Sequence, residues 1–234
     1  QAQTSRIVMS AHAINEGKFP DISNGKDTDF FFIKNDDADA VATAIVDLVK
    51  NRLPKGYHMP LSKIQVLTPM QRGVVGSANL NLILQEALNP TKEGLSRGGY
   101  NFRKGDRVMQ IRNNYDKEVF NGDLGYIESV NQEDRTLMVN FEERLVEYEV
   151  SELDELSLAY ATTIHKAQGS EYPIVVMPVL MKHYVMLQRN LIYPGITRAK
   201  KVCVLIGSTK ALAYAIHNLT VSNRNTKLKE RLQL

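Results

Sequence analysis

The amino-acid sequence predicts an α/β fold, in which a largely parallel sheet carries a small inserted β-barrel. Strand-like segments at residues 29–33 and 64–67 alternate with helical segments, which is the pattern of a parallel sheet covered by helices. From about residue 98 to 155 there is no convincing helical periodicity, and short strands separated by turn residues take its place. After Leu156 strands and helices alternate again, so we expect the barrel to interrupt a single α/β domain.

The elements of the first part follow from the spacing of apolar residues. Residues 5–16 read as a short helix, and a polar loop leads from it to the strand at 29–33. Residues 36–53 have an acidic first turn and apolar side chains at helical spacing, namely Val41, Ala44, Ile45, Leu48 and Val49. Another amphipathic helix includes Leu80 and stops at Asn89 and Pro90, because proline cannot continue a helix.

The later elements are predicted in the same way. The barrel is expected to have strands at 107–111, 125–130, 136–141 and 145–150. Turn residues such as Asn-Gly-Asp at 121–123 connect them. Beyond the barrel we expect strands at 174–179 and 201–206, helices at 188–198 and 211–218, and a terminal helix at 223–234.

The composition is that of an ordinary globular protein, with 43% hydrophobic and 24% charged residues. No apolar run reaches the roughly 18 residues that a membrane-spanning helix needs, so we expect no membrane partner. The single cysteine, Cys203, cannot form an internal disulfide, which fits a location in the reducing cytoplasm. The net charge of +3 is too small to identify a nucleic-acid partner.

The densest group of polar side chains is the segment 162–171 (TTIHKAQGSE), just before the strand at 174–179. Hydroxyl, imidazole, ammonium, amide and carboxylate groups gather here at an expected sheet edge, where α/β folds hold ligands. The residues alone predict a site for a phosphate-bearing partner and do not name it. A capped helix whose polar residues face water would give the same pattern, and it is the better default for so short a stretch.

Two further clusters could contact an anion. Residues 193–201 (YPGITRAKK) place three cations within four positions, although a basic helix end that complements the helix dipole explains them at least as well. The loop at 68–73 (TPMQRG) directly follows a strand, and its Arg72 could either hold a phosphate or be solvated.

These clusters occur in an order that resembles the RecD/TraA-type superfamily-1 DNA helicases. Residues 159–171 resemble helicase motif V of that family, and residues 197–200, behind Tyr193, resemble motif VI. Residues 1–17 resemble the region after the family's Arg-Gln pair, and residues 66–90 resemble its TPM-x-x-G loop with the following helix. Residues 102–110 and 119–123 resemble the opening of its SH3-like insertion. The resemblance covers nearly the whole chain.

The resemblance implies a RecA-like second motor domain of the P-loop NTPase type at residues 1–97 and 156–234, with an SH3-like β-barrel at 98–155. It also implies a parent enzyme, similar to the exodeoxyribonuclease V α-chain, that uses ATP and Mg²⁺ to translocate 5′ to 3′ on single-stranded DNA. The resemblance is also compatible with partner subunits that act in DNA recombination and repair.

The same resemblance assigns the site residues. Arg198 is expected to be the arginine finger that faces the γ-phosphate, and the nucleotide side of the cleft is expected to be lined by Gln168, Gly169 and Glu171. Contacts with the DNA backbone are expected from Thr163, His165, Thr68, Pro69 and Arg72. No metal ligand is expected, because His165 has no second His, Cys or acidic residue at metal-binding spacing nearby.

The sequence contains no Gly-x-x-x-x-Gly-Lys-Ser/Thr loop, which would hold the phosphates of ATP. Asp154 and Glu155 follow no apolar strand and make a poor Walker B motif. The chain also begins without methionine at what reads as a helix. We therefore expect it to be part of a longer protein whose N-terminal motor domain holds ATP and Mg²⁺, and to be inactive without that domain.

Motif VI departs from the family at residues 194–195, which are Pro-Gly where the family usually has Thr-Ala or Thr-Gly. Proline inside a helix removes a backbone donor and costs about 3 kcal/mol. We therefore expect the helix to kink or restart there, which would change the direction in which the Arg198 side chain points.

Two other classes of function stay open. A non-enzymatic nucleic-acid-binding module would need an aromatic and basic face on the strands between 107 and 150, and would have no use for motifs V and VI. A complete hydrolase would use Glu171 or His165 and would turn over without a partner domain.

Overall fold

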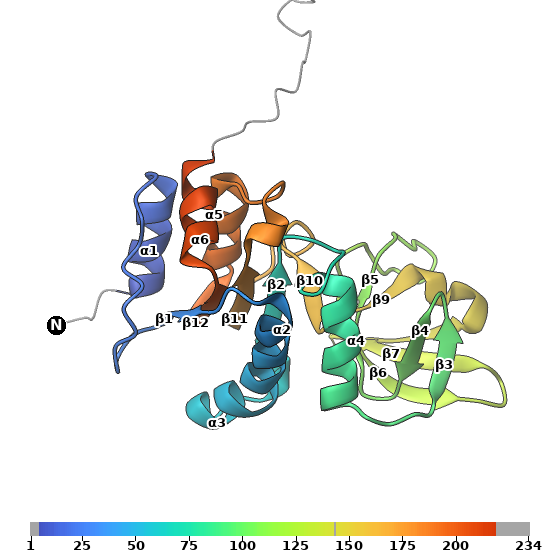
Figure 1. The fold of residues 1–234 in the computed structure, drawn as a ribbon. Coiled ribbons are helices and arrows are strands. Elements are labelled where there is room, and N and C mark those ends of the chain that lie inside the picture. Colours follow the sequence, from blue (N-terminus) through green and yellow to red (C-terminus); the bar gives the residue numbers. More distant parts are fainter. Residues whose placement is uncertain (1–4, 143, 219–234) are drawn as a thin grey trace, which may run out of the picture.

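The central sheet has five strands, all paired in parallel, in the order β1-β12-β11-β2-β10 (Figure 1). The computed structural model describes residues 5–142 and 144–218. The strands are β1 (Phe30–Lys34), β2 (Ile64–Thr68), β10 (Ala161–Thr163), β11 (Tyr172–Val179) and β12 (Ala199–Gly207). The predicted α/β class is confirmed, and the four strands predicted outside the insertion all lie in this sheet.

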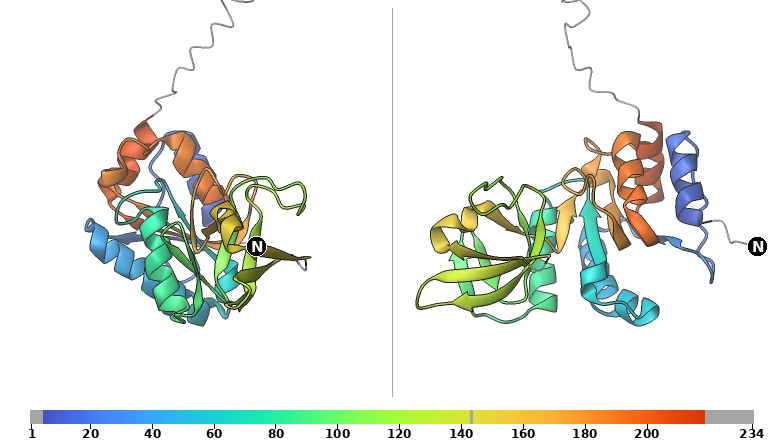
Figure 2. Two further views of the ribbon diagram at one scale, coloured as in Figure 1. Left: turned by 90° about the vertical axis from the view of Figure 1, so that its right-hand side faces the viewer. Right: turned by 180° about the vertical axis from the view of Figure 1, so that it is seen from behind.

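Helices cover both faces of the sheet (Figures 1 and 2). One face carries α1 (Arg6–Asn15), α5 (Arg189–Thr197) and α6 (Thr209–His217), and the other α2 (Ala38–Asp47), α3 (Leu53–Tyr57) and α4 (Ser77–Leu88). Along β11, Val175 and Met177 join the core beneath α5, whereas Ile174 and Val176 join the core beneath α2. Because both faces are buried, β11 and β12 are apolar along most of their length.

No helix in the described part of the chain is long and apolar enough to cross a bilayer. The helix predicted at 223–234 lies outside the described residues.

The helix that begins at Ala38 extends beyond its predicted end at Leu53. It passes through a π-helical turn (Leu48–Arg52) into α3, and His58 caps it in the left-handed conformation. In the π-helical turn, the Leu53 N–H donates to the Leu48 carbonyl. Pro54 has no N–H and in a regular helix would clash with the carbonyl four residues earlier, so the wider turn accommodates it.

Helix α5 neither ends nor restarts at Pro194, contrary to the expectation from the sequence. The carbonyl that loses its helical donor belongs to Asn190, in the first turn, where few helical bonds depend on it. The Pro194 carbonyl itself accepts hydrogen bonds from Thr197 Oγ1 (2.9 Å) and Arg198 Nε (3.3 Å). The turn that contains the proline therefore helps to orient Arg198 at the end of the helix.

Between α4 and β10 the chain forms a separate antiparallel unit, drawn in green to yellow in Figure 1. A hairpin of β3 (Gly94–Arg97) and β4 (Tyr100–Arg103) precedes a five-stranded sheet in the order β8-β7-β6-β5-β9. Its strands are β5 (Arg107–Gln110), β6 (Leu124–Asn131), β7 (Thr136–Phe141), β8 (Arg144–Glu149) and β9 (Leu156–Leu158). The four predicted barrel strands are confirmed; the hairpin and β9 were not predicted. In the described part of 98–155 the only helical segment is a 3-10 helix, Val150–Glu155.

Buried amide side chains of α4 fasten this insertion to the α/β domain. Asn81 donates to the carbonyls of Leu158 (3.0 Å) and Ala161 (2.9 Å), and it accepts from the Ala161 N–H (2.8 Å). Gln85 donates to the carboxylate of Asp106 (2.6 Å). Asn81 is only 3% exposed, so water cannot replace its bonds. They fix the point at which the chain leaves β9 and enters β10.

Replacing Asn81 with leucine should destabilise the chain by more than about 2 kcal/mol, because each buried backbone group left without a partner costs about 1–3 kcal/mol. Urea denaturation followed by circular dichroism measures this change. The matched control is Asn190→Leu, at an exposed position of α5, which should change stability by less than about 0.5 kcal/mol. Equal stability of the two variants would show that Asn81 does not hold this junction.

Candidate functional site

At the carboxyl edge of the sheet, β2 and β10 end side by side. Thr163 is in register with Thr68, and the Ile164 N–H donates to the Thr68 carbonyl (3.1 Å). The Thr68 hydroxyl donates to the Val75 carbonyl (2.7 Å) and so ties the loop of residues 69–76 back to the strand. The loop is tightly wound, because a Cβ atom at Gly76 would lie 2.4 Å from the loop's own backbone.

The residues predicted to contact DNA at this edge differ in exposure. Thr68 is 0% exposed and Pro69 is also buried, so their side chains lie beneath the loop surface. Arg72 and His165 are exposed, and Thr163 is half-buried. Only the last three can meet a partner directly, whereas Thr68 and Pro69 shape the loop that carries Arg72.

A hollow of about 90 Å³ opens between this loop, β10 and the insertion. Gln71, Thr163, Lys166 and Tyr100 line it, and so does Thr162, whose buried hydroxyl has no hydrogen-bond partner in the described structure. Gln71 belongs to the loop that was assigned to DNA, whereas Tyr100 and Lys166 were not chosen from the sequence. Lys166 belongs to the polar cluster and could have been chosen, but no sequence signal places Tyr100 of the insertion beside β10.

The segment between β10 and β11, residues 164–171, runs from the carboxyl edge of the sheet back to its amino edge. Because β2 lies between the two strands, this connection crosses the sheet on the face that α5 covers. Ile164 and Ala167 are buried there, at 2% and 0% exposure, while His165 and Gln168 are exposed. The Ala167 N–H donates to the Thr163 carbonyl (3.2 Å), which winds the connection into a turn.

Two glycines allow this arrangement. A Cβ atom at Gly195 would lie 2.8 Å from Met177 Sδ and 3.3 Å from Ile164 Cδ1, so the missing side chain lets α5 pack directly on the connection. Gly169 has φ +85°, a left-handed conformation that favours glycine, where the connection turns toward β11. The structure thus gives a packing reason for the Gly at position 195 of motif VI.

At the amino edge, β11 and β12 begin side by side and bring the end of the connection to Arg198. The Tyr172 N–H donates to the Arg198 carbonyl (2.9 Å). The half-buried guanidinium of Arg198 donates to the carbonyls of Ser170 (3.2 Å) and Pro194 (3.3 Å), which are neutral acceptors. No carboxylate among residues 5–142 and 144–218 pairs with it. Its positive charge is therefore available to an anion.

Glu171 lies at the same edge but is already paired. Its carboxylate forms an ion pair with Lys200 (2.7 Å), and both side chains are about half exposed. This pair joins the end of the connection to β12, as the Arg198 hydrogen bonds do.

The predicted site residues therefore fall into two groups at opposite edges of the sheet. The Thr68–Arg72 loop, Thr163 and His165 lie at or near the carboxyl edge, and Glu171 and Arg198 lie at the amino edge. Gln168 and Gly169 belong to the connection between them. The arrangement can hold one anionic partner at each edge.

Two protein-family models match the chain. The SH3 domain of ATP-dependent RecD-like DNA helicases matches residues 80–141, which run from α4 through most of the antiparallel insertion. The C-terminal domain of UvrD-like helicases matches residues 158–206, which include β10, the connection, β11, α5 and β12. This second match includes candidate site residues from both edges of the sheet.

Individual relatives agree with the family models. The ATP-dependent RecD2 DNA helicase of Deinococcus radiodurans is 34% identical over 100% of this chain, which spans 31% of that relative. The RecBCD enzyme subunit RecD of Haemophilus influenzae is 28% identical over 69% of this chain and 24% of the relative. The chain thus spans about a third or less of these relatives.

A solved structure of Pif1 helicases, described for unwinding at forked double-stranded DNA, aligns with a TM-score of 0.50 at 16% identity. The alignment covers 88% of this chain and 47% of that chain, and at this identity it shows the shared fold alone. The fold, the two family matches and the order of the motifs agree. The chain belongs to the RecD-like superfamily-1 DNA helicases, and it matches the SH3 domain of RecD-like helicases and the C-terminal domain of UvrD-like helicases.

Proposed function

We propose that this chain is the second motor domain of an ATP-dependent helicase that translocates 5′ to 3′ on single-stranded DNA. In this proposal residues 1–97 and 156–234 form the motor domain, and residues 98–155 form its SH3-like insertion, except that the strands β3 and β9 at these bounds pair within the insertion. The observation that carries the proposal is the placement of exposed polar groups and Arg198 at opposite edges of one sheet, joined by a connection that buried Ile164 and Ala167 anchor. Such a domain can hold DNA and nucleotide at once and couple them.

The carboxyl edge offers groups that proteins use to hold a nucleic-acid backbone. Arg72 and His165 are exposed there, and Thr163 adds a hydroxyl beside the hollow. Half to two-thirds of protein–DNA hydrogen bonds go to phosphate and sugar from such side chains. We assign backbone contacts to these three residues, and we assign Thr68 and Pro69 the role of positioning the loop.

The amino edge fits one side of a site for ATP. Arg198 has a planar fork of donors that suits a phosphate, and neutral carbonyls hold it without cancelling its charge. In the proposal Gln168, Gly169 and Glu171 line the same side. The sequence has no phosphate-binding loop, so the cradle for ATP and the ligands for Mg²⁺ would come from another motor domain. The chain alone is then expected not to hydrolyse ATP.

Neither rival function accounts for the site as well. A complete hydrolase based on Glu171 would need a free carboxylate, but this one is paired with Lys200, and one based on His165 finds no carboxylate paired with its imidazole among the described residues. A nucleic-acid-binding module finds support in Tyr115 and Phe120, an exposed aromatic pair on the insertion whose ring centroids lie 6.0 Å apart. A module that only binds nucleic acid would not explain why neutral carbonyls hold the unpaired guanidinium of Arg198.

The Haemophilus influenzae relative is a subunit of an enzyme, RecBCD. By analogy, we include in the proposal that the parent of this chain can act with other recombination or repair subunits, in the cytoplasm.

Arg72→Ala should weaken the binding of a single-stranded oligonucleotide to the 234-residue chain and should flatten its salt dependence. Each phosphate contact on a single strand contributes about 0.7 to the slope of log affinity against log salt, so the slope should fall by about that amount. His165→Ala should also weaken binding. Fluorescence anisotropy at low and moderate salt measures both effects.

The control for these titrations is Arg52→Ala, at an exposed arginine on the π-helical turn. It removes the same charge away from the carboxyl edge and should leave the affinity and slope nearly unchanged. If Arg72→Ala and His165→Ala both bind like the unaltered chain, the assignment of this edge to DNA is wrong.

Arg198→Ala should abolish DNA-stimulated ATP hydrolysis in a protein that joins this chain to a P-loop motor domain. An arginine finger is worth a factor of about 10³ to 10⁵ in turnover, and most DNA binding should persist. Arg198→Lys should rescue little, because an ammonium group cannot reproduce the planar fork. Steady-state ATPase assays with and without DNA check this, with Arg52→Ala as the control of equal charge change.

Two results would overturn this part of the proposal. Retention of most activity by Arg198→Ala would show that another cation meets the γ-phosphate. Appreciable hydrolysis of ATP by the 234-residue chain alone would show that it is not half of a two-domain site.

A further inference from the structure

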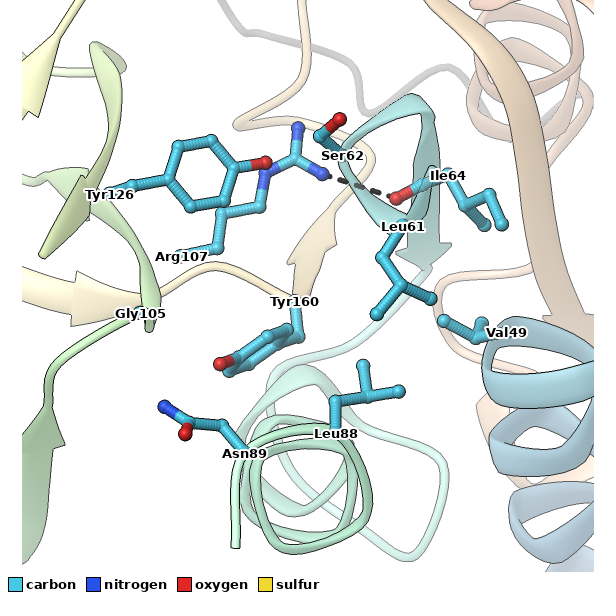
Figure 3. Close-up of a pocket in the computed structure, with 10 residues that line it drawn as sticks. All are labelled: Val49, Leu61, Ser62, Ile64, Leu88, Asn89, Gly105, Arg107, Tyr126 and Tyr160. Atoms are coloured by element: carbon cyan, nitrogen blue, oxygen red, sulfur yellow. Dashed lines mark hydrogen bonds between the residues drawn. The ribbon is translucent and has the colours of Figure 1, made fainter. Parts of the chain in front are cut away.

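A cavity of about 250 Å³ lies where the insertion meets the α/β domain (Figure 3). Leu61 and Leu88 line it from the α/β domain, Tyr126 lines it from the insertion, and Tyr160 lines it from the link between β9 and β10. These side chains make its wall largely aliphatic and aromatic. None of the residues assigned above to DNA or nucleotide lines this cavity.

Arg107 of β5 brings a positive charge to the cavity. The residue is only 7% exposed, and one of its terminal nitrogens donates to the Ile64 carbonyl (3.1 Å). Its Nε–H has no hydrogen-bond partner in the described structure. The guanidinium carbon lies 6.0 Å from the ring centroid of Tyr126 and 5.8 Å from that of Tyr172. No carboxylate in the described part of the chain forms an ion pair with Arg107.

A buried charge without a counter-ion and a buried N–H without an acceptor are both costly, and native structures usually satisfy them. The neighbouring carboxylate of Asp106 is already saturated. It accepts hydrogen bonds of 2.6 to 2.8 Å from the side chains of Gln85, Asn89 and Tyr160 and from the backbone N–H of Arg103. Lys63 and Lys104, which are adjacent in sequence to lining residues, are both exposed.

We propose that this cavity binds a small planar anion, consisting of one aromatic ring that bears a carboxylate. A carboxylate oxygen accepts from the guanidinium group of Arg107, which lines the cavity, and compensates its charge, a pairing for which the guanidinium fork is well shaped. The ring packs between the aliphatic side chains and the tyrosine rings that Figure 3 shows around the cavity. A volume of about 250 Å³ limits the occupant to a molecule of this size. Water alone would leave the charge of Arg107 without a partner.

Benzoate is the probe, titrated into the full chain labelled with ¹⁵N while the Arg107 Nε–H resonance is followed by NMR. Arg107→Lys serves only to assign that resonance. Benzamide, which has nearly the same shape as benzoate but no charge, is the control ligand. Benzoate should shift the resonance saturably and should bind at least about tenfold more tightly than benzamide, since hydrogen bonds between charged groups are the stronger ones.

A matched pair of variants locates the binding. Leu61→Trp should fill the cavity and weaken benzoate binding by about tenfold or more, and Leu61 is exposed enough (41%) for the fold to accept the change. Leu82→Trp makes the same substitution at similar exposure (43%) on α4, outside the cavity, and should bind benzoate normally. No saturable shift, equal affinity for benzoate and benzamide, or full binding by Leu61→Trp would each overturn the proposal. The test needs neither DNA nor ATP, so its result is independent of the proposed motor function.

Discussion

The rest of the molecule depends on the connection between β10 and β11. Parallel strands usually need a crossover of a dozen or more residues, yet residues 164–171 pass β2 and return to the opposite edge of the sheet in one wound turn. So short a connection holds its shape because Ile164 and Ala167 are buried beneath α5, and because Gly195 lets that helix approach. The two edges are therefore joined by packed side chains. Close-packed interiors transmit small displacements, so we expect movement at Thr163 to reach Arg198.

The insertion is attached at the most sensitive point of this arrangement. Strand β10 has three residues and pairs only with β2 at the edge of the sheet, so its own backbone hydrogen bonds hold it weakly. Asn81 supplies the missing bonds and ties β10 to the end of β9 in the insertion. A shift of the insertion against α4 would act directly on the start of the segment that leads to Arg198. The cavity beside Arg107 lies at this same junction, so an occupant would contact both units and hold them together.

Much of the fold could be predicted because the long strands and amphipathic helices carry strong periodic signals. The three-residue strands β9 and β10 carry none, since their positions come from pairing with distant strands and from Asn81. The continuation of the helix past Leu53 and of α5 through Pro194 reflects local adjustments that a proline rule does not foresee. The family resemblance suggested the candidate site residues, but only the coordinates separate buried Thr68 from exposed Arg72. The sequence did not indicate a role for Tyr100 or Arg107, because both lie in the insertion and contact residues of the α/β domain.

Hydrogen–deuterium exchange of the 234-residue chain, with and without a saturating single-stranded oligonucleotide, tests most directly whether the two edges are mechanically linked. A packed connection predicts that DNA slows exchange throughout residues 164–172, including the Tyr172 N–H that donates to the Arg198 carbonyl. If exchange slows only in residues 69–76 and near Thr163, while residues 168–172 exchange as before, the edges act independently and the packed connection does not couple DNA to the nucleotide side.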